Sequence, residues 1–82
     1  MARNAAELRA LTQEANETAR KAQVTITQAK MLAEEAGQQY SRISEKLSGA
    51  FTQTQQATQS LDESWRSLSI AVNIGDDYSR ML

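Results

Sequence analysis

The residues of this chain with chemical potential are its carboxylate pairs, and their spacing does not suit catalysis. Glu14 and Glu17 stand three residues apart, so a helix would place both on one face, where they could hold a cation. A solvated face on which Glu17 pairs with Lys21 is the simpler interpretation. Glu34-Glu35 and Asp62-Glu63 are adjacent pairs that diverge around a helix, so neither pair can converge on one substrate atom.

The residue types that carry most metal and nucleophile chemistry are absent. The 82 residues include no histidine and no cysteine. Thiolate zinc sites, cysteine nucleophiles, disulfides and imidazole catalysis are therefore excluded. We expect no catalytic residue, no metal ligand and no cofactor site, and we interpret the chain as a protein that is not an enzyme.

Charge and hydropathy limit the possible partners. Nine basic and ten acidic residues are interleaved, and the densest basic spot is only Arg20-Lys21. This pattern does not favour nucleic acid or an anionic membrane. No apolar run approaches a membrane span, and Met1-Ala2-Arg3 does not begin a signal-peptide core. The expectation is a soluble chain without membrane insertion, cytoplasmic by default.

Helix is the element that these residues predict. The chain has no proline and is rich in alanine and glutamine. Asn4 can cap a helix while Glu7 reaches back to it, and Asn73-Ile74-Gly75 offers a glycine as helix terminator. Asp76-Asp77 then disfavours a further turn, because carboxylates destabilise a helix C-terminus. We therefore predict one helical unit over residues 1–82, with an arm at 1–3, a helix at about 4–73 and a tail at 74–82.

Two interleaved series of apolar and small residues, each with a seven-residue period, indicate how this helix packs. The first series is Leu8, Ala15, Ala22, Ala29, Ala36, Ile43, Ala50, Ala57, Ser64 and Ala71. The second series is Thr12, Ala19, Ile26, Ala33, Tyr40, Leu47, Thr54, Leu61 and Leu68. No member is charged, and the alternating spacing of four and three is that of coiled-coil a and d positions. The pattern predicts an all-α coiled coil.

The predicted seam changes character along its length. It is mainly alanine as far as Ala36, which allows close helix spacing, and it becomes bulkier from Tyr40 onward. A second apolar stripe of Phe51, Trp65 and Val72 flanks the bulky half. This face is too wide for a two-stranded seam, so the second half is expected to pack in a helical bundle.

The sequence allows either one long helix or two helices folded back on each other. The heptad phase passes through Gly37 and Gly49 without a skip, which favours a continuous helix in a coiled coil or bundle. The alternative is a hairpin that turns near Ser48-Gly49 or near Gly37. Glu34 and Glu35 would oppose the helix dipole at the Gly37 turn, whereas Arg42 and Lys46 would favour the Ser48-Gly49 turn.

The exposed apolar surface indicates what kind of function to expect. A helix or hairpin of this size leaves apolar side chains exposed, so the chain is expected to associate. We predict a structural or assembly protein that forms homo-oligomers through its alanine-rich seam. The alternative is a small adaptor, chaperone or secretion-type subunit whose aromatic stripe docks a larger protein. The predicted protein-interface residues are Ile26, Tyr40, Ile43, Leu47, Phe51, Leu61, Trp65, Leu68 and Val72.

Overall fold

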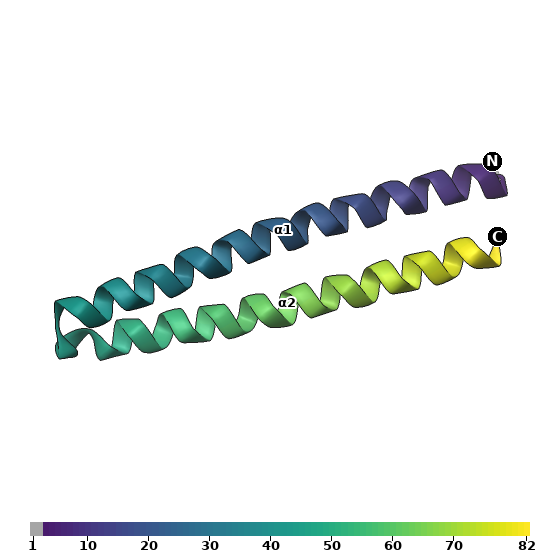
Figure 1. Cartoon of the computed structure of the whole chain (residues 1–82). Coiled ribbons are helices and arrows are strands. Elements are labelled where there is room, and N and C mark those ends of the chain that lie inside the picture. Colours follow the sequence, from purple (N-terminus) through teal and green to yellow (C-terminus); the bar gives the residue numbers. More distant parts are fainter. Residues whose placement is uncertain (1–2) are drawn as a thin grey trace.

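The computed structural model describes residues 3–82 as two long helices joined by a short turn. Helix α1 spans Ala5–Ile43, the 3₁₀ helix η1 spans Glu45–Leu47, and helix α2 spans Ser48–Met81 (Figure 1). The described residues contain no strand, so the predicted all-α class is confirmed. Of the predicted arm, Met1 and Ala2 lie outside the described residues, and Arg3 precedes α1.

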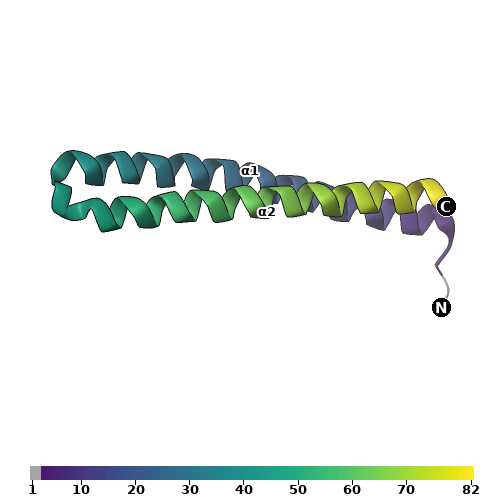
Figure 2. The same ribbon diagram turned by 90° about the horizontal axis from the view of Figure 1, so that it is seen from below.

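The two helices run antiparallel, side by side, so the chain is a helical hairpin. Its extents are 61 × 19 × 14 Å. The start of α1 and the end of α2 lie at the end away from the turn, and the helices twist about each other along their length (Figures 1 and 2). The continuous helix expected over about 4–73 is not observed. Folding back covers part of the apolar seam that a lone helix would expose to water.

Capping residues set the start of α1 and the turn. The Asn4 side chain accepts a hydrogen bond of 2.8 Å from the Glu7 amide, as predicted. The Glu7 carboxylate lies 3.7 Å from Arg3. Ser44 ends α1 with an extended backbone (φ −168°, ψ 145°), and its hydroxyl accepts from the Lys46 amide at 3.1 Å. The turn therefore directly precedes Ser48-Gly49 and is not at Gly37.

The predicted helix end near residue 73 and the tail at 74–82 are wrong. Helix α2 continues through Gly75 to Met81, and Gly75 does not have the positive φ of a helix terminator. Gly75 is instead a point of close approach to α1. Asp76 accepts a hydrogen bond from Asn16, and Asp77 pairs with Arg80, so both carboxylates have partners within the helix or across the pair.

Helix α2 turns a different face inward from the one the heptads predicted. Leu61 and Leu68 of the predicted seam are half-buried, but Ala57 and Ala71 are exposed. Their place is taken by the flanking stripe, in which Val72 is only 8% exposed. The most buried residues of α1, Asn16 and Gly37, lie whole heptads away from Val72, so both helices bury this series in one continuous phase. The unbroken heptad phase was therefore not evidence for a continuous helix, because a hairpin keeps it as well.

Candidate functional site

A ladder of polar contacts joins the two helices along one edge of the hairpin. Asn16 donates to Asp76 at 3.0 Å, and Gln23 donates to Ser69 at 2.7 Å. Gln23 also donates to the Trp65 carbonyl oxygen at 3.1 Å. The partners on α1 recur every seven residues, so each heptad adds one cross-helix contact. Such contacts favour one register of the antiparallel pair.

The next rung is an ion pair. Lys30 lies 2.9 Å from Asp62, with side chains 35% and 42% exposed. The hydrogen bond to Asp62 and the attraction of its negative charge raise the pKa of Lys30 above its ordinary value. The lysine is therefore kept charged, as suits a structural ion pair rather than a proton-transfer group.

Two glycines bring the helices close together along the same edge. A Cβ atom on Gly37 would lie 2.5 Å from Thr54 Oγ1 and 3.4 Å from the Phe51 ring. A Cβ atom on Gly75 would lie 2.5 Å from Asn16 Oδ1. The two distances of 2.5 Å are shorter than real Cβ contacts, so a larger residue at either position would make Thr54 or Asn16 shift.

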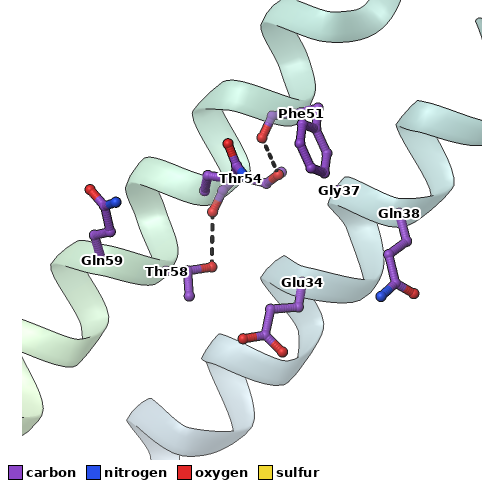
Figure 3. Close-up of a pocket in the computed structure, with 8 residues that line it drawn as sticks. Glu34, Gly37, Gln38, Phe51, Thr54, Thr58 and Gln59 are labelled. Carbon is purple, nitrogen blue, oxygen red and sulfur yellow. Dashed lines mark hydrogen bonds between the residues drawn. The ribbon is translucent and has the colours of Figure 1, made fainter.

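A shallow hollow opens beside Gly37 near the turn. Its volume is about 470 Å³, and the Phe51 ring lies beside Gly37 in its wall (Figure 3). The hydroxyls of Thr54 and Thr58 donate hydrogen bonds to backbone carbonyl oxygens of α2, at 2.6 and 3.0 Å. With Glu34 as its single charged group, the hollow lacks the converging polar groups of a ligand site.

No charged residue occupies the opposite edge of the two helices, although Arg3, which precedes α1, lines a hollow at the open end of this edge. We call this surface the uncharged strip. On α1 it comprises Leu8, Leu11, Ala15, Thr18, Ala22, Thr25, Ala29, Leu32, Ala36, Gln39 and Ile43. On α2 it comprises Ala50, Gln53, Ala57, Ser60, Ser64, Ser67, Ala71, Ile74, Tyr78 and Met81. An ordinary protein surface is about 25–35% charged, whereas all 19 charged residues of this chain lie elsewhere.

The two halves of the strip lie on the same side of the molecule. Each helix has a line of residues that faces the other helix. In an antiparallel pair, residues that are rotated away from this line in the same direction around each helix axis lie on the same side of the pair. The residues of the polar ladder are rotated in one direction from the helix contact, and the residues of the strip are rotated in the opposite direction on both helices. The strip therefore lies on the side opposite the polar ladder. A hollow of about 380 Å³ supports this placement, because Leu8, Leu11 and Ala15 line it together with Ala71 of α2, and Arg3 also lines it.

Most of the strip is open to water. Its large apolar members include Leu32, Ile43, Ile74 and Met81, which are 66%, 71%, 64% and 82% exposed. Between them lie alanines and serines, whose small side chains allow another helix to approach closely. The strip therefore resembles a helix-packing surface that lacks its partner.

The predicted interface residues are divided between the inside and the outside of the hairpin. Val72 is buried, and five are half-buried: Ile26, Leu47, Phe51, Leu61 and Leu68. The three exposed ones are Tyr40 at 39%, Trp65 at 43% and Ile43 at 71%. Much of the predicted set therefore lies in contact with the other helix of the same chain, and its role toward another protein stays a prediction.

The polar ladder was missed by sequence reasoning, although a signal for it exists. Asn16, Gln23, Lys30 and Gly37 recur every seven residues, and so do Asp62, Ser69 and Asp76. Apolar periodicity alone does not reveal such series. Within residues 3–82, no group of three His, Cys, Asp or Glu residues could hold a metal ion. In the same part of the chain, neither long helix is apolar enough to cross a membrane.

Comparison with known proteins identifies no relative of this chain. No family model matches the chain, and no curated protein or solved structure is similar to it.

Proposed function

We propose that this chain is a non-enzymatic assembly protein whose hairpins associate with one another through the uncharged strip. The observation that carries the proposal is the strip itself: 21 positions on two helices, all without charge, over the whole length of the hairpin. Burial of such a surface against a second helical hairpin would give a four-helix bundle.

The large surface area of the chain supports the proposal that the hairpin packs against a partner. The hairpin exposes 6334 Å², whereas a compact monomer of its mass would expose about 4,900 Å². The excess is of the order of the area that each partner buries in a stable protein complex, about 800 Å². No side chain of the described residues is fully buried, so the hairpin has little core of its own.

Docking of the aromatic stripe to a larger protein is the less favoured alternative. Val72 is buried and Phe51 is half-buried against α1, so Trp65, which is 43% exposed, is the one member of that stripe open to another protein. The alanine-rich seam is the better candidate because its α2 half faces outward.

The test is sedimentation of two matched variants. Thr25 and Thr27 are both exposed threonines of α1 whose hydroxyls bond the carbonyl four residues earlier, at 3.2 and 3.1 Å. Only Thr25 belongs to the strip. Thr25→Glu is expected to weaken self-association more than tenfold, because it buries an unpaired charge, whereas Thr27→Glu leaves it unchanged. A wild-type chain that sediments as a folded monomer at 100 µM would refute the proposal.

A further inference from the structure

The charges that border the uncharged strip on α1 have a pattern that selects the orientation of the second copy. The outer border is formed by Glu7, Glu14, Lys21, Gln28, Glu35 and Arg42, which recur every seven residues. All six are exposed. Glu7 lies 3.7 Å from Arg3 of its own chain, whereas none of the ion pairs among the described residues involves the other four charges.

Reversal of the border about Gln28 matches each of the four charges from Glu14 to Arg42 with an opposite charge, whereas Glu7 falls opposite position 49, beyond the end of α1. Glu14 then stands opposite Arg42 of the other copy, and Lys21 stands opposite Glu35. A two-fold axis at Gln28 would repeat both pairs, which gives four ion pairs. Charges that flank an apolar helix seam in this way set partner and orientation in coiled coils.

The shape of the strip fits the same orientation. Near the turn, Ile43 projects from the strip and is 71% exposed. Near the open end, Leu11 and Ala15 line the hollow of about 380 Å³. Antiparallel stacking about Gln28 brings Ile43 of each copy over this hollow of the other. One register therefore satisfies the charges and the apolar shapes together.

We propose that two hairpins pack strip to strip and antiparallel, α1 on α1 and α2 on α2, with the two-fold axis near Gln28. This inference rests on the proposed function and specifies its partner, a second copy of this chain. The border of α2 brings Glu63 near its own symmetry mate. This one like-charge approach is outweighed by the four opposite-charge pairs.

The other closed two-fold arrangement, with both turns at the same end, is disfavoured. It would lay α1 on α2 of the partner with their borders adjacent. The Asn16–Asp76 hydrogen bond fixes the relative level of the two helices, so Glu14 would come beside Asp77 of the other copy. No opposite-charge pair would form along those borders. Exposed pairs contribute little to affinity, but they discriminate between orientations.

Charge reversal tests the orientation. Lys21→Glu and Glu35→Lys each turn two attractive pairs into repulsive ones, so each is expected to raise the dissociation constant of the dimer about fivefold to thirtyfold. The double variant Lys21→Glu/Glu35→Lys exchanges the charges and should restore it. An equimolar mixture of the two single variants should also associate as tightly as wild type.

A thiol cross-link gives an independent measure, since the chain has no cysteine. Gln28→Cys should cross-link to itself through a short thiol-reactive linker, because both copies of residue 28 lie at the axis. Thr27→Cys, which points away from the strip, should not. A wild-type dimer with neither restoration by the double variant nor a residue-28 cross-link would overturn the orientation and leave the proposed function standing. A monomeric wild type would overturn both.

Discussion

Single residues at the helix contact decide how closely α1 and α2 approach. Gly37 and Gly75 both lie where a Cβ atom would collide with the other helix, whereas nothing lies within 4 Å of a Cβ on Gly49. All three glycines are helical in an otherwise glycine-free pair of helices. Alanine is the better helix former at each position. Replacement by alanine should nevertheless destabilise the hairpin at Gly37 and Gly75 and stabilise it at Gly49.

Gly37→Ala is expected to lower the free energy of unfolding by about 1–3 kcal/mol, because Thr54 must move or the helices must separate. Gly49→Ala should raise it by about 0.5–1 kcal/mol, because alanine orders the helix at a lower entropic cost. Urea unfolding followed by circular dichroism, at one fixed protein concentration, measures both.

The contact atom provides a further control for this prediction. Removing the Thr54 hydroxyl in Gly37→Ala/Thr54→Ala should recover most of the loss, since that oxygen is the nearest atom to the new Cβ. If Gly37→Ala is as stable as Gly49→Ala, the close approach at Gly37 contributes nothing to packing.

At the level of the elements, the turn depends on one serine more than on a glycine. Ser44 leaves the helical conformation and its hydroxyl accepts a hydrogen bond from the Lys46 amide at 3.1 Å. Glycine was the residue that the sequence suggested for a turn, but no glycine of the described chain has positive φ. A side-chain cap thus does the work expected of a flexible backbone.

Ser44→Ala is expected to lower the free energy of unfolding by about 0.5–2 kcal/mol, because the amide loses its cap. Ser44→Asp should retain most of the stability, since its carboxylate can accept the same bond. Ser41→Ala is the control: Ser41 is an exposed residue of α1 whose hydroxyl donates to the Gln38 carbonyl at 2.9 Å. Its loss should change stability by less than about 0.5 kcal/mol. Equal effects at 41 and 44 would refute the capping role.

The elements themselves were largely predictable, and their pairing was not. Composition and the Asn4 cap indicated helix from the correct start, and the all-α class followed. The hairpin with a turn near Ser48-Gly49 was only the alternative prediction, because Ser44 sits in a sequence that would also continue a helix and because the heptad phase is the same on both sides of it. The extension to Met81 was missed because Gly75 was interpreted by its backbone freedom instead of its lack of a side chain.

The candidate surface was predictable only in part, for a reason at the scale of the whole molecule. The alanine series was identified correctly as uncharged and suited to close packing. Which half of it faces outward depends on how α2 is rotated against α1. That rotation follows from Val72, Gly75 and the polar ladder acting together. The sequence therefore predicted the series from Leu8 to Ala71 as a packing surface, whereas the other positions of the strip were identified only from the structure.

The proposed dimer makes a prediction about overall dimensions. In the antiparallel arrangement about Gln28, the two turns lie at opposite ends of the particle. Residue 46 of one copy is then separated from residue 46 of the other by about 36 helical rises, or roughly 50–55 Å. With both turns at the same end, the two residues would be within about 20 Å, the width of two adjacent helices. The separation of the turns therefore distinguishes the two closed arrangements directly.

Spin labels on Lys46→Cys allow this distance to be measured by pulsed dipolar spectroscopy. Lys46 is exposed and makes its turn contact through its backbone amide, so the label should leave the hairpin intact. A single distance of roughly 50–55 Å is expected, in a particle of about twice the 9.1 kDa mass of the chain. Dilution with unlabelled chain should weaken the dipolar signal without shifting the distance, because each dimer then carries fewer label pairs. A distance near 20 Å would place the turns together, and the charge pattern along α1 would then have no role in orientation.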